Sequence, residues 1–470
     1  MKIGLVSLGC PKNLVDSEVM LGLAQGAGHE LTSDTAEADV LVVNTCAFID
    51  RAKQESIDTI LELAQHKTNG RCRKLVVTGC LAERYRDELK AEIPEIDIVL
   101  GTGEVESIVG ALESEPALVG AGPAAVPMTF HRTAPLSAHV AARHRDAVVA
   151  ERDLPTYLYD AATPRVLTTP KHYAYVKIAE GCDYNCAFCI IPKLRGQYRS
   201  RPVESIVAEA RSLAARGVRE LLLISQDSTF YGVDRRERGA LARLLRELNQ
   251  VDGIAWIRLL YLYPTTVTEE TIEAMATCDK VVPYIDLPLQ HAADGVLKRM
   301  RRPGSRASYE RLLLGLRERL PNVTLRTTFI TGFPGETEAD FQELCDFVKT
   351  VEFDHVGVFT YSHEEGTAAH ALGDDVPART KAARQRKLMA LQRTIVARRH
   401  RRRLGERVQV LVDGPSPEHE LAWTGRLAGQ APEIDPLVYL TDVDPEVVRP
   451  GDLIEAEIVE SRGYDLVVRV

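Results

Sequence analysis

The 470-residue sequence predicts an α/β protein in three parts: an N-terminal doubly wound parallel sheet, a central incomplete TIM-like (β/α)6 barrel, and a small C-terminal all-β barrel. In the first two parts, short runs rich in Val, Ile and Leu alternate with helical patterns, which is typical of parallel sheets. The last 66 residues instead hold short alternating strands. This length also fits about three domains of roughly 100–200 residues each.

The first region, residues 1–125, is predicted to form the doubly wound sheet. Its expected strands are Ile3–Ser7, Val40–Asn44, Lys74–Val77 and Ile96–Leu100, and its helices are Asp16–Ala27, Arg51–His66 and Leu81–Lys90. A cysteine follows each of the first three strands: Cys10, Cys46 and Cys80. Because right-handed crossovers make parallel strands point one way, these sulfurs should emerge at one edge, where open sheets bind ligands. The three cysteines either form a three-thiolate ligand site or are ordinary small buried residues without a ligand role.

Residues 126–165 are predicted to be a linker without an identifiable role, since Ala and Pro replace the periodic pattern there.

Residues 166–404 hold the predicted barrel and a basic helix. The expected strands are Tyr173–Ile178, Glu220–Ile224, Trp256–Leu260, Val282–Leu287, Thr324–Ile330 and His355–Phe359. The expected helices are Val203–Arg216, Gly239–Asn249, Glu269–Ala276, Tyr309–Arg319 and Glu338–Thr350. Polar motifs follow four strands, where TIM-type barrels place their chemistry: Cys182, Gln226-Asp227, Gln290-His291 and the turn Gly332–Glu336.

The basic helix is predicted over Ala378–Leu404, with 11 Lys or Arg and no Asp or Glu. Leu388, Leu391 and Ile395 form an apolar stripe at helical spacing, so one face should pack. The charges suit phosphate, but a solvated face or an acidic neighbouring domain explains them equally well.

The tail, residues 405–470, is predicted to be the small barrel. Its expected strands are Arg407–Val412, Leu421–Arg426, Val438–Leu440, Leu453–Ser461 and Asp465–Val470. It contains 14 Asp or Glu against 5 Arg, a net charge of −9. Such a barrel repels an RNA backbone and attracts a basic protein, unless the acidity serves solubility alone.

Composition places the chain among ordinary globular proteins, with 45% hydrophobic and 27% charged residues. No apolar run approaches the length of a membrane span. Nine cysteines, an odd number in a chain without an export signal, argue against a disulfide framework. We therefore expect a cytoplasmic protein.

The most specific motif is CxxxCxxC at Cys182, Cys186 and Cys189. Three thiolates with this spacing can hold an iron–sulfur cube and leave its fourth iron without a protein ligand. A structural zinc site would need a second Cys or His pair, and only His172 lies near. The other cysteines, Cys72, Cys278 and Cys345, are interpreted as ordinary structural residues.

This motif, with Phe188 before its last cysteine, resembles that of the radical S-adenosylmethionine (SAM) enzymes. In that superfamily the open iron binds SAM, which is reduced to a 5′-deoxyadenosyl radical. A three-cysteine α/β domain before the barrel and a small β-barrel after it resemble the radical SAM methylthiotransferases. The last module is similar to the TRAM domain, which holds RNA in RNA-modifying relatives.

The resemblance implies two [4Fe–4S] clusters, one on Cys182, Cys186 and Cys189 and one on Cys10, Cys46 and Cys80. One SAM would give a methyl group to sulfur on the second cluster, and another would be cleaved at the first. The two clusters would then face one cavity. Candidate polar contacts to SAM are Gln226, Asp227, Gln290 and His291. The turn Gly332–Glu336 either begins a helix or contacts the cofactor through its backbone. No nucleophile or general base is needed.

Two branches of the family differ in substrate: one modifies adenosine in tRNA, the other an aspartate of small-subunit ribosomal protein twelve (uS12). Several segments are similar to the protein-modifying branch: Ser7–Glu18, Cys189–Gly196, Ser225–Gly232 and Tyr284–His291. One departure is His363, where Pro is usual, although it touches no cluster ligand.

The expected function is methylthiolation of the aspartate β-carbon on uS12, free or in the small subunit. The alternatives are tRNA adenosine methylthiolation and a non-enzymatic iron–sulfur protein that binds ribosomes. Expected partners are an electron donor such as flavodoxin or ferredoxin and a sulfur source, with no membrane. RNA contact is expected only through the helix at 378–404.

Overall fold

The computed structural model describes residues 1–115, 154–416 and 422–470. Residues 116–153 contain most of the predicted linker and the boundary at residue 125, and they lie outside the described residues, as does Leu421. The chain divides into two compact units. The first unit comprises residues 1–168, 180–185 and 189–199, and the second comprises residues 169–179, 186–188 and 200–470.

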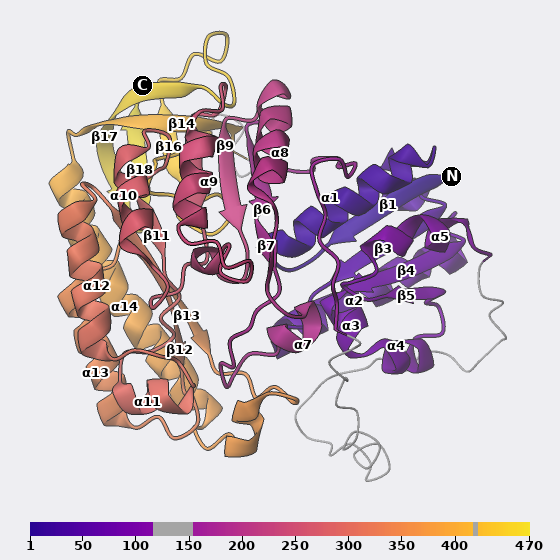
Figure 1. The fold of residues 1–470 in the computed structure, drawn as a ribbon, viewed down its shortest axis with the longest axis horizontal. Helices are drawn as coiled ribbons and strands as arrows, with labels where there is room; N and C mark the ends of the chain where they lie inside the picture. Colours follow the sequence, from indigo (N-terminus) through magenta and orange to yellow (C-terminus); the bar gives the residue numbers. More distant parts are fainter. Residues whose placement is uncertain (116–153, 417–421) are drawn as a thin grey trace. The chain divides into compact units, whose positions relative to one another are not determined.

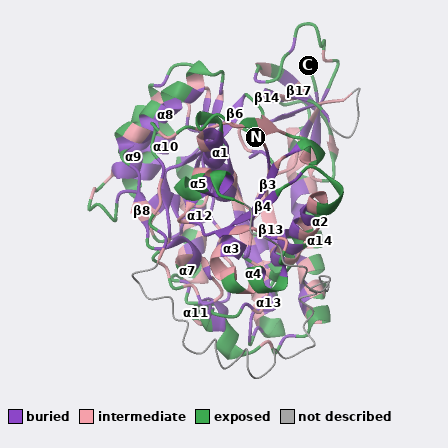
Figure 2. Cartoon of the chain, turned by 90° about the vertical axis from the view of Figure 1, so that its right-hand side faces the viewer, coloured by how far each residue is buried: buried purple, intermediate pink, exposed green. Residues whose placement is uncertain are grey.

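The first unit contains the five-stranded sheet, in the order β2-β1-β3-β4-β5 with every neighbouring pair parallel (Figure 1). Its strands are β1 (Lys2–Ser7), β2 (Glu30–Thr32), β3 (Val40–Thr45), β4 (Lys74–Gly79) and β5 (Ile98–Leu100). Its helices include α1 (Pro11–Gly26), α2 (Asp50–Asn69), α3 (Cys80–Arg84), α4 (Arg86–Glu92) and α5 (Ile108–Glu113). The doubly wound prediction is confirmed. Strands β3 and β4 are buried along their whole length, as Figure 2 shows.

Two details of this sheet differ from the sequence pattern. The short edge strand β2 has no apolar run that could reveal it. The helix predicted over Leu81–Lys90 is two helices, α3 and α4, because Tyr85 between them has a non-helical backbone (φ −134°, ψ 39°). Part of the predicted linker also belongs to this unit, namely the described residues at its C-terminal end. Its Arg165 forms a buried ion pair with Glu18 of α1, so residues 154–168 are packed on the domain.

The second unit begins with six parallel strands that follow one another in chain order. They are β6 (Tyr173–Lys177), β9 (Glu220–Ile224), β10 (Trp256–Leu259), β11 (Tyr284–Asp286), β12 (Thr324–Thr331) and β13 (His355–Thr360). They form two three-stranded sheets, which a parallel bridge between Ile257 and Val281 connects. This arrangement confirms the incomplete (β/α)6 barrel.

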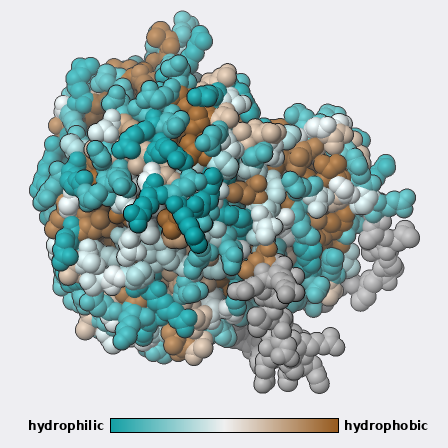
Figure 3. All heavy atoms as spheres, viewed as in Figure 1, coloured by the Kyte–Doolittle hydropathy of each residue, from teal (hydrophilic) through white to brown (hydrophobic). Residues whose placement is uncertain are grey.

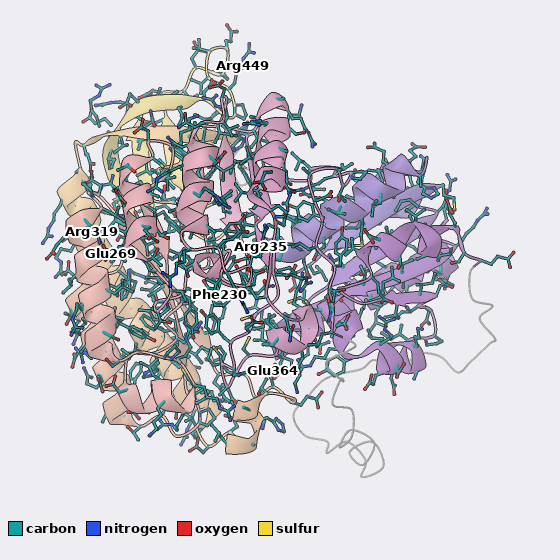
Figure 4. The ribbon with its side chains drawn as sticks, in the orientation of Figure 1. Phe230, Arg235, Glu269, Arg319, Glu364 and Arg449 are labelled. Atoms are coloured by element: carbon teal, nitrogen blue, oxygen red, sulfur yellow. The ribbon has the colours of Figure 1, made fainter. Side chains whose placement is uncertain are left out.

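The helices between these strands are α8 (Val203–Ala215), α9 (Ala240–Asn249), α10 (Glu269–Thr277), α11 (Asp294–Arg299), α12 (Arg306–Arg319) and α13 (Glu338–Val351). Neighbouring helices are joined at the surface by charged pairs. Figure 4 shows one of them, in which Arg319 at the end of α12 pairs with Glu269 at the start of α10. The sequence pattern did not reveal α11, because it is only six residues long.

The basic helix α14 (Ala378–Arg403) follows the barrel. Six of its basic residues pair with carboxylates of the same unit: Lys381, Arg384, Lys387, Arg398, Arg399 and Arg403. These ion pairs favour the interpretation that acidic neighbours balance the helix. RNA contact through α14 stays a prediction.

The C-terminal strands close into a small barrel in the order β14-β15-β16-β18-β17. They are β14 (Arg407–Pro415), β15 (Trp423–Arg426), β16 (Val438–Thr441), β17 (Leu453–Arg462) and β18 (Asp465–Arg469). Apolar residues such as Val410, Val438 and Ile458 fill its interior. The all-β prediction for the tail is therefore confirmed.

Buried polar contacts fasten this small barrel to the strands of the (β/α)6 barrel. Glu220 of β9 is fully buried and accepts from Arg258 of β10 and from Arg426 of β15. Asp435 accepts a hydrogen bond from Tyr284 Oη at 2.6 Å and pairs with Arg326. The charged residues in these contacts thus each have a partner of opposite charge, which buried charges need.

Hydrophilic residues cover most of the face in Figure 3, with hydrophobic side chains scattered among them. In the described part of the chain, no helix is both long and apolar enough to cross a membrane.

Candidate metal centres

The structure brings Cys10, Cys46 and Cys80 together at the carboxyl edge of the sheet in the first unit. They follow β1, β3 and β4, which are neighbours in the sheet. Burial raises the pKa of the Cys46 thiol to about 12, with further contributions from the charges of Cys80 and Cys10. The three cysteines therefore follow the carboxyl ends of three neighbouring parallel strands, as the topology predicted.

Three thiols form a donor set that an iron–sulfur cluster can use. Among the described residues, no three Cys, His, Asp or Glu side chains are arranged to hold one metal ion. Burial raises the pKa of the Cys46 and Cys80 thiols, and a metal offsets this because it deprotonates the sulfur that it binds. The donor set therefore fits an iron–sulfur cluster.

Two glycines give the cysteines their positions. Gly9 and Gly79, which precede Cys10 and Cys80, both have positive φ, at 91° and 93°. A Cβ on Gly9 would lie 2.8 Å from Cβ of Cys46, and a Cβ on Gly79 would lie 2.2 Å from Oδ1 of Asn44. A larger residue at either position would displace the thiols.

Asn13 ties the loops of this site together. Its Nδ2 donates to the carbonyl oxygens of Leu8, at 3.0 Å, and Thr45, at 2.8 Å. Leu8 lies just after β1 and Thr45 ends β3, so one amide holds the two strand ends that carry Cys10 and Cys46.

The buried Arg195 completes the site. It ends the short helix α7 (Ile191–Arg195), whose Leu194 packs in the apolar core of the first unit. Arg195 Nη2 lies 3.8 Å from Sγ of Cys80 and also donates to Oδ1 of Asn13. Burial opposes its charge, but Glu180, Cys80 and Asp16 hold its pKa well above the ordinary value. The guanidinium therefore stays cationic beside the thiols.

The CxxxCxxC motif occupies the loop between β7 (Ala179–Glu180) and α7. Its three cysteines are half-buried. Cys182 and Cys189 belong to the first unit and Cys186 to the second. In the first unit, the Cys182 N–H donates to the Gly196 carbonyl at 3.0 Å. Gly181 has φ 81°, and a Cβ there would lie 2.0 Å from the Gln197 carbonyl oxygen.

In the second unit, backbone hydrogen bonds hold the residue after Cys186 in place. Ala187 donates to the Met300 carbonyl at 2.8 Å and accepts from the Ala369 N–H at 2.6 Å. Arg302 Nη1 lies 3.6 Å from Sγ of Cys186. Sequence reasoning singled out neither Arg195 nor Arg302. Arg195 lies in the Cys189–Gly196 segment, which is similar to the protein-modifying branch. That resemblance was the only signal in the sequence that could have identified it as a functional residue.

Comparison with known proteins places this arrangement in a family. Residues 2–101 match the model of the uncharacterized protein family UPF0004, residues 176–348 match the radical SAM superfamily, and residues 404–470 match the TRAM domain. A ribosomal protein uS12 methylthiotransferase RimO from Koribacter versatilis is 49% identical over 484 residues, covering 100% of this chain and 96% of the relative. RimO proteins from Solibacter usitatus (48%, covering 99% of this chain and 94% of the relative) and Trichlorobacter lovleyi (46%, covering 100% and 98%) are similar. The chain belongs to the RimO family of radical SAM methylthiotransferases.

The solved structures show the same barrel fold. The radical SAM methyltransferase TsrM from Kitasatospora setae aligns with a TM-score of 0.52 at 17% identity, over 76% of this chain and 74% of TsrM. As a radical SAM methylthiotransferase, this protein is an enzyme that uses a [4Fe–4S] cluster and SAM. Such a cofactor carries the radical chemistry, and the protein binds and orients it.

Gln226 and Asp227 follow β9 in this radical SAM methylthiotransferase, as predicted. Asp227 is buried, and its Oδ1 accepts from the backbone N–H of Thr229 at 2.8 Å and of Phe230 at 3.2 Å. It therefore caps the short 3₁₀ helix η4 (Ser228–Phe230). Gln226 is half-buried beside it. Contact of either residue with SAM stays a prediction.

Gln290 and His291 follow β11 and have different surroundings. Gln290 is half-buried, has φ 73°, and makes no side-chain hydrogen bond to any described residue. A positive φ in a residue other than glycine is uncommon and clusters at functional sites. Contact of the Gln290 amide with SAM stays a prediction.

His291 is fully buried, and its Nδ1 accepts from the Ala293 N–H at 3.0 Å. Burial lowers its pKa to about 3, so the ring is neutral. Its Nε2 lies 3.7 Å from Glu336 of the Gly332–Glu336 turn. Glu336 accepts from the Gly332 N–H at 2.6 Å and pairs with Arg384 of α14 at 2.8 Å. These contacts give the turn a structural role, and cofactor contact by His291 stays a prediction.

Proposed function

We propose that this enzyme carries two [4Fe–4S] clusters and transfers a methylthio group to the β-carbon of an aspartate in ribosomal protein uS12. The observation that carries the proposal is the second group of thiols, Cys10, Cys46 and Cys80, assembled at the edge of a separate sheet. A radical SAM enzyme that only cleaves SAM needs a single cysteine triplet. The additional triplet supports a second cluster for sulfur chemistry.

Radical chemistry suits this substrate, because no acid–base pair ionises a C–H bond on an unactivated carbon. The bound cluster and SAM would supply the radical. In this chain Cys182, Cys186 and Cys189 would hold that cluster. Gln290 would hydrogen-bond to SAM, since its amide is otherwise unused among the described residues.

The choice of uS12 is supported by relatives and by charge. The relatives of 46–49% identity all bear the name uS12 methylthiotransferase. The C-terminal barrel exposes carboxylates that form no ion pair with described residues: Asp442, Asp444, Glu446 and Glu455. Exposed negative charge attracts a basic ribosomal protein and repels RNA phosphates. We further propose a flavodoxin or ferredoxin as electron donor and a separate sulfur source.

The competing function is methylthiolation of adenosine in tRNA. Its support is the TRAM module together with basic residues of α14 that form no ion pair with any described residue, such as Arg401 and Arg402. The non-enzymatic alternative is not retained, because the chain belongs to an enzyme family.

The test incubates the reconstituted enzyme with reductant, sulfide and SAM, and offers uS12 and tRNA in the same reaction. Mass spectrometry of both substrates should find the methylthio group on an aspartate of uS12. A modified adenosine beside unmodified uS12 would overturn the proposal. Iron analysis should give about eight irons per chain, four for each cube, and about four would remove the second cluster.

A further inference from the structure

Arg302 is a buried arginine that faces a cysteine sulfur. The residue is 8% exposed and follows α11. Its Nη1 donates to Sγ of Cys186 at 3.6 Å, and its Nη2 donates to the Pro288 carbonyl at 2.5 Å. Its guanidinium lies over the Tyr263 ring, 4.2 Å from the ring centroid. All of these groups belong to the second unit.

The charge of Arg302 lacks a carboxylate partner. Of the six arginines that are buried in the described part of the chain, five pair with a carboxylate: Arg195, Arg201, Arg258, Arg384 and Arg426. Arg302 forms no such ion pair with any described residue, and its buried Nε has no hydrogen-bond partner there. A buried cation without a counterion is costly, so the site needs an anion.

The backbone holds Arg302 in this place. The preceding Arg301 has φ 54°, a left-handed conformation that is uncommon outside glycine. The Arg302 N–H donates to the Leu297 carbonyl at 2.9 Å, which fixes the turn against α11. The neighbouring Met300 carbonyl accepts from Ala187, the residue after Cys186. One turn therefore fixes both the arginine and the cysteine.

We propose that Arg302 is the counterion of the cluster held by Cys182, Cys186 and Cys189 and sets its reduction potential. The inference rests on the ligand assignment in the proposed function. Three thiolates and an iron–sulfur core form an anion, and the added electron makes it more negative. A guanidinium that donates to a ligand sulfur stabilises the reduced form and raises the potential. Arg302 therefore favours the reduction that precedes SAM cleavage.

The competing role for Arg302 is a direct contact with the carboxylate of SAM. That role predicts weaker SAM binding in a variant and an unchanged potential when SAM is absent. The contact with Cys186 Sγ favours the cluster instead, because it already occupies one of the two terminal nitrogens.

The experiment uses the full chain with Cys10→Ala, Cys46→Ala and Cys80→Ala, so that one cluster remains. The protein is reconstituted anaerobically with iron and sulfide and titrated with dithionite and mediators without SAM, while electron paramagnetic resonance follows the reduced cluster. Arg302→Gln should lower the ratio of reduced to oxidised cluster about tenfold at a fixed potential, a shift of about 59 mV for one electron. Arg302→Lys should shift less, because it keeps the charge but loses the planar donor.

Arg384→Gln is the matched control, since it removes an equally buried arginine whose partner is Glu336. It should titrate like the parent. The inference is overturned if Arg302→Gln also titrates like the parent, if the control shifts as much, or if Arg302→Gln weakens SAM binding alone. If the triple-alanine parent binds about four irons but Arg302→Gln does not change the reduction potential, the inference about Arg302 is wrong while the ligand assignment still holds. A parent without iron would overturn the ligand assignment and this inference together.

Discussion

Asp16 and Glu180 share one nitrogen of Arg195: their carboxylates lie 2.8 and 2.9 Å from its Nη1. Asp16 lies in α1, and Glu180 stands two residues before the CxxxCxxC motif. The pair joins the start of that motif to the helix that follows Cys10, within the first unit.

Replacement of Arg195 should therefore destabilise the first unit strongly. Arg195→Gln removes the cation that these two buried carboxylates share, and breaking a buried ion pair costs about 3–5 kcal/mol. The measurement is the free energy of unfolding of the apoprotein in urea. Arg195→Lys should lose less. Equal stability of Arg195→Gln and the parent would contradict the buried network.

The two cysteine triplets should separate into two functions. Cys46→Ala should reduce the iron content from about eight to about four per chain and abolish methylthio transfer, while SAM cleavage to 5′-deoxyadenosine continues. Cys186→Ala should abolish 5′-deoxyadenosine formation. Chromatography of 5′-deoxyadenosine together with iron analysis checks both results. Loss of SAM cleavage in Cys46→Ala with its first cluster intact would show that the triplets do not act separately.

Gly9 should be intolerant of any side chain. Gly9→Ala combines a positive φ with a Cβ that would lie 2.8 Å from Cβ of Cys46. We expect about four irons per chain after reconstitution instead of about eight. Gly110→Ala in α5 is the control, because nothing lies within 4 Å of its added methyl group. It should bind as much iron as the parent; full iron loading of Gly9→Ala would refute the steric argument.

His291 should make the protein less stable in acid. Its folded pKa of about 3 lies below the ordinary value of 6.5, so the folded state keeps the neutral ring. Between pH 6.5 and 3 the unfolded chain binds a proton that the folded chain does not. Stability therefore falls on acidification through this window, by about 1.4 kcal/mol per pH unit, and this contribution stays constant below it. His291→Gln should remove that slope from urea unfolding curves, and an identical slope in both proteins would contradict the assignment.

The exposed acidic residues of the small barrel should contribute to uS12 binding. Asp442→Lys with Glu446→Lys should raise the dissociation constant for uS12 at low salt, and added salt should reduce the difference. Formation of 5′-deoxyadenosine should not change, because both residues lie on the C-terminal barrel. Binding experiments at two ionic strengths check this. Tighter tRNA binding without weaker uS12 binding would favour the RNA-modifying alternative.

The elements that the sequence predicted share one physical signal. Strands such as β3, β4 and β9 are buried along their whole length and contain a continuous apolar run, and such runs are visible without any structure. Parallel topology then placed Cys10, Cys46 and Cys80 together. The short β2 had no such signal.

The arginines at the two sites could not be predicted, since their partners are remote in sequence. Arg195 and Cys80 are 115 positions apart, and Arg302 and Cys186 are 116 apart. The burial of His291 could not be predicted either: its position at the end of a strand indicated a ligand contact, which stays a prediction, and the structure shows that the ring is fully buried. Position along a strand is encoded locally, whereas the direction of a side chain depends on residues far away.

The shared use of Glu220 by Arg258 and Arg426 limits how this lineage could exchange its last module. A terminal barrel transplanted from another enzyme would need equivalents of Arg426 and Asp435, because Glu220 and Arg326 would otherwise each lose one of their two partners and keep only Arg258 and Asp286. The C-terminal barrel and the (β/α)6 barrel are thus expected to evolve together. Binding of a new macromolecule would then arise from changes in the outer loops of the C-terminal barrel.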